Sequence, residues 1–287
     1  KDCPRTKSPA GSRSVSPMRS SLALLLCAGL AACSMPATRP DAPAGPPGTG
    51  LYTQSFGNTP ARQVRTLIVV LHGDAPATKP DYHYAFARAA ADAVPNSIAV
   101  ALLRPGYEDP QGHRSPGERG QTTGDNYTPD RIAAVAETIR HLQHRYGQAR
   151  TVLVGHSGGA AIAADLAATW PHLVDGIVLV SCPCALPEWR KHMKTVAPTP
   201  LWDAPVDSLD PVKLVGGMPP SLRAAVLVGG DDKTTPLRFS RLYAEALSLR
   251  GIATDFRIIP GKGHELLGDP EVISALQRLA AALPGKS

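Results

Sequence analysis

The feature that most constrains this 287-residue chain is an alternation of short apolar runs with helical patterns, from about residue 66 to residue 283. The apolar runs are nearly continuous in Val, Ile and Leu, as is typical of strands buried on both faces of a sheet. They cover residues 66–72, 97–103, 151–155, 176–181, 224–230 and 255–260. Between them, apolar residues recur every three or four positions, as on one face of a helix, within 132–146, 239–247 and 272–283. This alternation predicts an α/β fold, with a mostly parallel central sheet flanked by helices and joined by right-handed crossovers.

One segment breaks the alternation. Residues 183–222 contain eight prolines and two of the three tryptophans, Trp189 and Trp202, without a strong period. The segment lies between two predicted strands, so it must leave the sheet and return to it. Because ligands bind at the carboxyl ends of strands in such sheets, we expect a short proline-rich cap over the binding site. A purely structural loop is the alternative.

Residues 18–33 have the pattern of an export signal. Met18 is followed by an arginine, an apolar run over 22–32 and small residues, which is typical of a secretory signal peptide. The run is too short to span a bilayer. The sequence LAAC, which ends at Cys33, resembles the lipobox of bacterial lipoproteins. This resemblance implies that the signal peptide, 18–32, is removed and that Cys33 carries lipid; an ordinary signal peptide with an incidental cysteine is the alternative.

The segments on either side of the signal have no periodic apolar pattern. Residues 1–17 are expected to be an upstream extension outside the mature protein. Residues 33–50 are rich in Pro, Ala and Gly and predict a flexible tether to a single domain of residues 51–287. Ser34 stands where lipoproteins retained in the inner membrane have aspartate. The resemblance therefore implies an exported protein that a lipid anchors to the outer membrane.

Charge and cysteine content limit the possible partners and cross-links. Residues 1–32 hold five basic residues and one acidic residue, so four of the six net positive charges lie there and only +2 remains on 33–287. No basic stripe interleaved with aromatic residues is left, so nucleic acid is not expected as a partner. Cys182 and Cys184, in SCPC, are the cysteines of the predicted domain. Their ring would be small and strained, which favours reduced thiols, although an oxidising compartment leaves a disulfide open.

A serine among glycines is the strongest chemical signal. The sequence GHSGG, residues 155–159, follows a predicted strand and opens an alanine-rich helix, with Ser157 at the turn. G-x-S-x-G alone is weak, but strand–turn–helix is the setting that exposes a serine nucleophile. Such a nucleophile needs a base and a third group that orients the base. His264 in GKGHE, and Asp231 or Asp232 in GGDDKTTP, each follow a later strand and are expected at the same edge of the sheet.

Five motifs occur in the order typical of the α/β-hydrolase fold family: LHGD at 71–74, RPGYED at 104–109, GHSGG at 155–159, GxxDxxxP at 229–236 and GxGH at 261–264. Residues 66–283 therefore resemble that family. The resemblance implies Ser157 as the nucleophile, His264 as the base and Asp232 as the acid, because Asp232 lies four residues before Pro236 and fits the acid loop better than Asp231. This chemistry requires neither a metal ion nor an organic cofactor.

The resemblance also implies an oxyanion site made by two backbone N–H groups. One belongs to Gly158, directly after the nucleophile, and the other to Asp74, directly after the His-Gly pair. The carboxylate of Asp74 would repel an oxyanion unless it points away or is paired, with Lys79 or Arg104 as the candidate cations. The amide of Ala75 is the alternative donor.

The sequence thus predicts an exported serine hydrolase that cleaves carboxylic esters through an acyl-enzyme. Its expected partners are a small-molecule ester and, through the lipid anchor, a membrane. Arg104, Tyr107 and Trp189 are expected to contact the substrate, with packing as the alternative for each. A peptidase or amidase of the same fold is one alternative function, and a non-catalytic, hydrolase-like binding lipoprotein is another.

Overall fold

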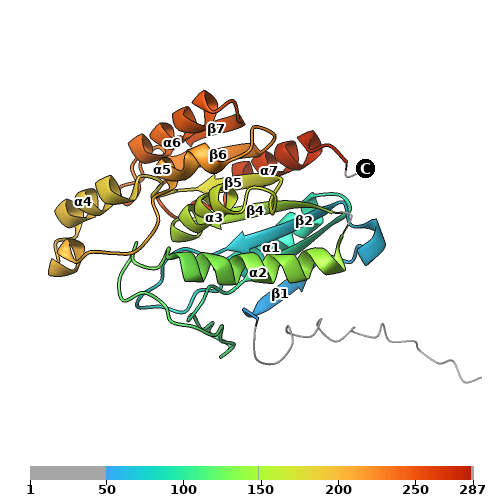
Figure 1. Ribbon diagram of the computed structural model, residues 1–287, viewed down its shortest axis with the longest axis horizontal. Helices are drawn as coiled ribbons and strands as arrows, with labels where there is room; N and C mark the ends of the chain where they lie inside the picture. Colours follow the sequence, from blue (N-terminus) through green and yellow to red (C-terminus); the bar gives the residue numbers. More distant parts are fainter. Residues whose placement is uncertain (1–49, 148, 286–287) are drawn as a thin grey trace, which may run out of the picture. The chain divides into compact units, whose positions relative to one another are not determined.

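The computed structural model describes residues 50–147 and 149–285, which form a seven-stranded sheet with helices on both faces (Figure 1). The strands are β1 (Thr53–Phe56), β2 (Thr66–Leu71), β3 (Ser97–Leu102), β4 (Arg150–His156), β5 (Gly176–Val180), β6 (Arg223–Gly229) and β7 (Ala253–Ile259). The α-helices are α1 (Tyr82–Ala93), α2 (Pro129–Arg145), α3 (Gly158–Thr169), α4 (Leu186–Val196), α5 (Pro211–Leu214), α6 (Leu237–Leu249) and α7 (Pro270–Ala282). Short 3-10 turns are η1 (Ala61–Gln63), η2 (Pro200–Asp203) and η3 (Val215–Gly217).

The strands lie in the order β1-β3-β2-β4-β5-β6-β7. Strands β2 to β7 are parallel, and β1 pairs antiparallel with β3. The predicted α/β fold with a mostly parallel sheet is confirmed, and each predicted apolar run coincides with one of the strands β2 to β7. Strand β1 was not predicted, because its sequence TQSF has no apolar run and three of its four residues are only partly buried.

The continuous apolar runs are explained by two hydrophobic cores, one on each face of the sheet. In β2, Leu67 and Val69 pack with residues of α2, α3 and α6 on one face. The alternate residues Ile68 and Val70 pack with residues of α1 and α7 on the other face. All four side chains are fully buried. Because successive side chains of a strand point to opposite faces, both sets of positions must be apolar.

The proline-rich segment leaves the sheet between β5 and β6 and contains α4, η2, α5 and η3. Arg190 of α4 holds the turn that follows, since its guanidinium donates to the carbonyl groups of Leu201 and Ala204. Trp189 ties the same helix to the loop after β6, because its Nε1 donates to the carbonyl of Thr234 at 2.8 Å. Helix α4 is therefore fixed at the carboxyl edge of the sheet, where the loops after β4, β6 and β7 also lie.

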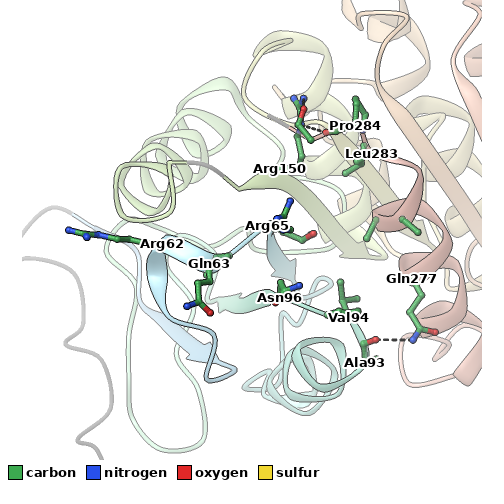
Figure 2. Close-up of a pocket in the computed structure, with 16 residues that line it drawn as sticks. Arg62, Gln63, Arg65, Ala93, Val94, Asn96, Arg150, Gln277, Leu283 and Pro284 are labelled. Carbon is green, nitrogen blue, oxygen red and sulfur yellow. Dashed lines mark hydrogen bonds between the residues drawn. The ribbon is translucent and has the colours of Figure 1, made fainter. Parts of the chain in front are cut away.

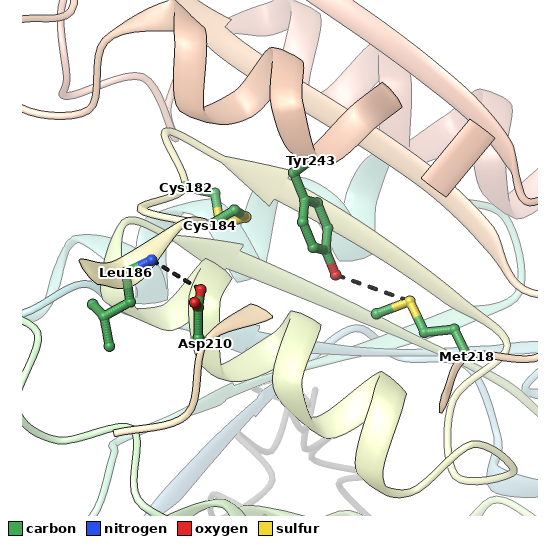
Figure 3. Close-up of a disulfide and its surroundings, with 6 residues drawn as sticks. All are labelled: Cys182, Cys184, Leu186, Asp210, Met218 and Tyr243. Carbon is green, nitrogen blue, oxygen red and sulfur yellow. Dashed lines mark hydrogen bonds between the residues drawn. A yellow bond between two sulfur atoms is a disulfide. The ribbon is translucent and has the colours of Figure 1, made fainter. Parts of the chain in front are cut away.

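Cys182 and Cys184 form a disulfide directly after β5 (Figure 3). The expectation of reduced thiols is therefore wrong. Their Cα atoms are 5.1 Å apart, which lies within the ordinary range for disulfides, so the intervening proline does not hold the two cysteines apart. Both residues are fully buried in the core that also contains Tyr243 of α6.

Candidate active site

Ser157 sits on a sharp turn between β4 and α3. Its backbone φ of 52° and ψ of −121° lie in a region that residues other than glycine rarely adopt. The flanking glycines permit the turn, because a Cβ on Gly155 would collide with the main chain of Gly159. A Cβ on Gly159 would collide with the carbonyl of His72 in the neighbouring loop. The turn leaves the serine partly exposed while the residues on both sides of it are buried.

The structure brings Ser157, His264 and Asp232 together at the carboxyl edge of the sheet, from the loops after β4, β7 and β6. Nε2 of His264 is 3.0 Å from Oγ of Ser157, and Nδ1 of His264 is 3.0 Å from Oδ2 of Asp232. A carboxylate can only accept at Nδ1, so the proton lies on Nδ1 and Nε2 is free to accept the serine proton. Asp231 is exposed, and among the described residues its carboxylate has no hydrogen bond or ion pair with His264, whose Nδ1 is paired with Asp232.

Asp232 is a buried and fully bonded carboxylate. Its Oδ1 accepts from the amides of Thr234 and Thr235 at 2.9 and 2.8 Å, and its Oδ2 accepts from the hydroxyl of Thr235 at 2.6 Å. Burial alone would raise the pKa of Asp232, but the hydrogen bonds from His264 and Thr235 outweigh it and lower the pKa to about 2. The group therefore stays ionised beside the imidazole across the neutral and mildly acidic range.

Two amide donors are available next to the serine. Among the described residues, neither the N–H of Gly158 nor that of Asp74 has an acceptor. The amide of Ala75, the alternative donor, lies 3.4 Å from the hydroxyl of Tyr107, whereas that of Gly73 donates to the hydroxyl of Tyr82 at 2.6 Å. The geometry is therefore consistent with an oxyanion site that uses the amides of residues 74 and 158.

The carboxylate of Asp74 is paired, and Arg104 rather than Lys79 is the cation. Its Oδ1 accepts from Nη1 of Arg104 at 2.9 Å, and its Oδ2 accepts from Tyr127 at 2.6 Å and from the amide of Gly124 at 2.9 Å. Lys79 instead pairs with Glu108. Burial opposes the charge on Arg104, but Tyr107 and Asp74 raise its pKa above the ordinary value.

The three residues that were expected to contact the substrate have different places. A cavity of about 440 Å³ opens beside Ser157 and is lined by residues of the 73–82 loop, by His264 and by Trp189 and Met193 of α4. Trp189 is thus in the wall of the cavity. Arg104 and Tyr107 are fully buried, do not line it, and instead support the loop at 73–75. The structure does not place these two side chains where a substrate would touch them.

Sequence reasoning missed two polar residues beside Ser157. Tyr82 opens α1 and lines the cavity, and its hydroxyl lies 2.8 Å from Nδ1 of His156. In the G-x-S-x-G pattern His156 is a variable position, so the sequence assigns it no role. No spacing in the sequence links Tyr82 to the motif, since the two are 74 residues apart.

A larger cavity, of about 950 Å³, lies at the amino ends of the strands and is shown in Figure 2. Arg62, Arg65 and Arg150 contribute to its wall, together with the ends of α1 and α7. Arg150 is already occupied there, because it donates to the carbonyl of Pro284 and to Asp175. The cavity lining, within the described part of the chain, includes no serine, cysteine or histidine.

The comparison with known families agrees with this geometry. Residues 66–282 match the family described as the alpha/beta hydrolase fold. The chain belongs to this family. In the alpha/beta hydrolase, Ser157, Asp232 and His264 follow one another in the chain order that is characteristic of such folds. No curated protein matches the sequence significantly.

Solved structures show the same fold at low sequence identity. A monoacylglycerol lipase from Paleococcus ferrophilus is 19% identical with a TM-score of 0.55, covering 80% of this chain and 98% of the lipase. Esterase PE8 is 19% identical with a TM-score of 0.58, covering 82% and 100%. The acylaminoacyl peptidase of Pyrococcus horikoshii is 14% identical with a TM-score of 0.56, covering 80% of this chain and 38% of the peptidase. At these identities the likeness shows the fold alone.

Proposed function

We propose that this alpha/beta hydrolase is a serine hydrolase that cleaves carboxylic esters through an acyl-enzyme. The observation that carries the proposal is the unbroken relay from Oγ of Ser157 through the imidazole of His264 to Asp232, with 3.0 Å at each step. A serine hydroxyl becomes a good nucleophile when a base lies at this distance and a carboxylate orients the base.

The proposed reaction has two halves. Oγ of Ser157 attacks the ester carbonyl carbon while Nε2 of His264 takes its proton, and the amides of Gly158 and Asp74 stabilise the oxyanion. The alcohol leaves with the proton from His264, so that the acyl group stays on Ser157. A water molecule then attacks the acyl carbon by the same route, His264 takes its proton and returns it to Oγ, and the acid is released. Asp232 stays ionised throughout and stabilises the imidazolium.

The cavity favours a small and polar ester. About half of its wall is polar, and Thr78, Thr123, Thr234 and Glu265 are among the polar lining residues. A long acyl chain would bury these polar groups without giving them partners, which is unfavourable. We therefore expect kcat/KM on p-nitrophenyl esters to be highest for acetate or butyrate and to fall for octanoate and longer chains. A steady rise with chain length would contradict this assignment of the cavity.

Hydrolysis of p-nitrophenyl butyrate tests the proposed function. Replacing Ser157 by Ala should abolish the activity, and Asp232→Asn should lower kcat roughly 10³–10⁴-fold. Asp231→Asn is the matched control, because this neighbour is exposed and does not reach His264. Absence of ester turnover in the wild-type protein, or a Ser157→Ala variant as active as wild type, would refute the proposal.

A peptidase or amidase is the second candidate, and one structural neighbour is an acylaminoacyl peptidase. Both reactions use the same relay, so the substrate decides between them. Turnover of acyl-peptide p-nitroanilides without turnover of esters would favour the second candidate. Turnover of neither, with Ser157 unreactive, would leave the alternative of a binding protein.

We further propose that the protein is exported and held at the outer membrane by a lipid on Cys33. The segments concerned, 1–17, 18–32 and 33–49, lie outside the described residues. Within 50–147 and 149–285, the structure has no helix with the length and apolar character needed to cross a bilayer. Metabolic labelling with palmitate tests the anchor, since label is expected on wild type and should be lost in Cys33→Ser. Equal labelling of both proteins would contradict the assignment.

A further inference from the structure

The main-chain carbonyl of His264 is held by three donors. The amide of Leu266 donates to it from the same loop at 2.9 Å. Oγ of Ser181 and Nε2 of His156 lie 3.0 Å from it and come from other parts of the chain. His156 is the last residue of β4, and Ser181 directly follows β5. Side chains at the ends of β4 and β5 thus donate hydrogen bonds to the backbone of His264.

The bond from His156 is one link in a longer chain of hydrogen bonds. The amide of Gly73 donates to Oη of Tyr82 at 2.6 Å, and Oη of Tyr82 lies 2.8 Å from Nδ1 of His156. A carbonyl can only accept, so Nε2 of His156 carries a proton and donates it to His264. In a neutral His156, Nδ1 is then an acceptor, and Tyr82 donates to it while accepting from the amide of Gly73.

The surroundings keep this chain uncharged. The side chain of His156 is almost fully buried, and burial, followed by the nearby His264, lowers its pKa. Burial also raises the pKa of the Tyr82 phenol. If His156 were charged at the same time as His264, the two imidazolium rings would repel each other, because their centroids are only 5.2 Å apart.

The loop that carries His264 is also held by the amide of Asp231, which donates to the carbonyl of Lys262 at 2.9 Å. It contains Gly261, with a φ of 69°, and Gly263, and neither has a neighbour within 4 Å of where a Cβ would lie. The bonds to Ser157 and Asp232 fix the direction of the two ring nitrogens of His264. They do not fix the position of the His264 backbone. Both side-chain bonds can form at the same time only if that backbone is correctly placed.

We propose that His156 and Tyr82 are positioning residues, which hold the His264 backbone so that its imidazole bonds Ser157 and Asp232 together. The same series of hydrogen bonds connects the loop that carries His264 to Gly73, which precedes the proposed oxyanion donor, the amide of Asp74. The donors for the transition state and the base that takes the proton are thereby fixed to one another. This proposal rests on the proposed function, since it assigns the two residues a role in that reaction.

Kinetics of matched variants test the proposal. His156→Phe keeps an aromatic ring but removes the bond to the His264 carbonyl, and kcat for p-nitrophenyl butyrate should fall about 100-fold, with KM within about threefold of wild type. Tyr82→Phe removes one link and should lower kcat about 10-fold. His156→Gln keeps an N–H donor and an acceptor, so it should recover most of the loss.

His83→Phe is the control variant. His83 is also fully buried and next to Tyr82, but neither of its ring nitrogens has a partner within the described part of the chain. We expect its kcat to stay within about threefold of wild type. The proposal is wrong if His156→Phe keeps full kcat, if Gln restores no more than Phe, or if His83→Phe is as damaging as His156→Phe.

A measurement that does not depend on activity separates this proposal from the proposed function. In ¹⁵N-histidine NMR of the wild-type protein, assigned by comparison with His156→Gln, the structure requires His156 to carry its proton on Nε2. In Tyr82→Phe this tautomer should become less uniform, since Nδ1 loses its donor. A proton on Nδ1 in wild type, or a charged His156 at neutral pH, overturns the hydrogen-bond chain even if the protein hydrolyses esters. Absence of ester turnover in wild type refutes the proposed function instead, and the proton on His156 is still read from the spectrum.

Discussion

The buried pair of Asp74 and Arg104 gives a stability prediction that can be worked from the structure. Their side chains are 4% and 0% exposed, and the Nη1–Oδ1 distance is 2.9 Å. Substituting Asp74 by Ala leaves the guanidinium of Arg104 in the interior without its carboxylate. It also removes the acceptor of the buried Tyr127 hydroxyl and of the Gly124 amide.

The cost of this substitution follows from the orphaned charge. Breaking a buried ion pair by removing one partner costs about 3–5 kcal/mol of unfolding free energy. For a domain of this size, 1 kcal/mol shifts the Tm by roughly 2–4 °C, so Asp74→Ala should melt about 6–20 °C below wild type. Urea unfolding followed by circular dichroism gives the free energy directly, provided that the m-value does not change.

The double variant Asp74→Ala/Arg104→Met is the control. It removes both charges and fills part of the space with an apolar side chain, so it should be less destabilised than Asp74→Ala alone. A loss below about 1 kcal/mol for the single variant, or a double variant at least as unstable as the single one, would refute the reasoning.

Two further predictions concern stability. The pKa of Asp232 is lowered to about 2, so its contribution to stability is present above the unfolded-state value near 4 and is lost as the pH falls through 2. The difference in unfolding free energy between wild type and Asp232→Asn should therefore shrink by about 2 kcal/mol between pH 5 and pH 2, and a difference independent of pH would contradict this. The disulfide between Cys182 and Cys184 closes a very short loop, so Cys182→Ser/Cys184→Ser should cost about 1.5 kcal/mol by loop entropy. Peptide mapping without reduction should find the two cysteines linked in one peptide, and free thiols there would contradict the disulfide.

The sheet could be predicted because its central strands are constrained on both faces. Residues such as Leu67 and Ile68 face different cores, so the run had to be apolar throughout. Edge strand β1 has no such constraint and left no signal. The pairing state of Cys182 and Cys184 was predicted wrongly, because it depends on the path of the backbone through Pro183 rather than on the residue types.

The candidate site could be predicted only for those residues that the sheet topology brings to the same edge. Ser157, Asp232 and His264 each follow a strand, and parallel strands end at one edge, so their proximity follows from chain order. The hydrogen bond between Tyr82 and His156 cannot be predicted from the order of residues along the polypeptide, because it depends on how the loop before α1 folds back over β4. The burial of Arg104 could not be predicted for the same reason, although pairing with Asp74 was one of two open alternatives.

The central claim is that Ser157 is an activated nucleophile, and its most direct test is covalent labelling with a fluorophosphonate. The reagent should modify wild-type protein at Ser157, identified by mass spectrometry of the peptide, while His264→Ala should react far more slowly and Ser157→Ala not at all. Failure of the wild-type protein to react, or modification at another residue that persists in Ser157→Ala, would contradict the account.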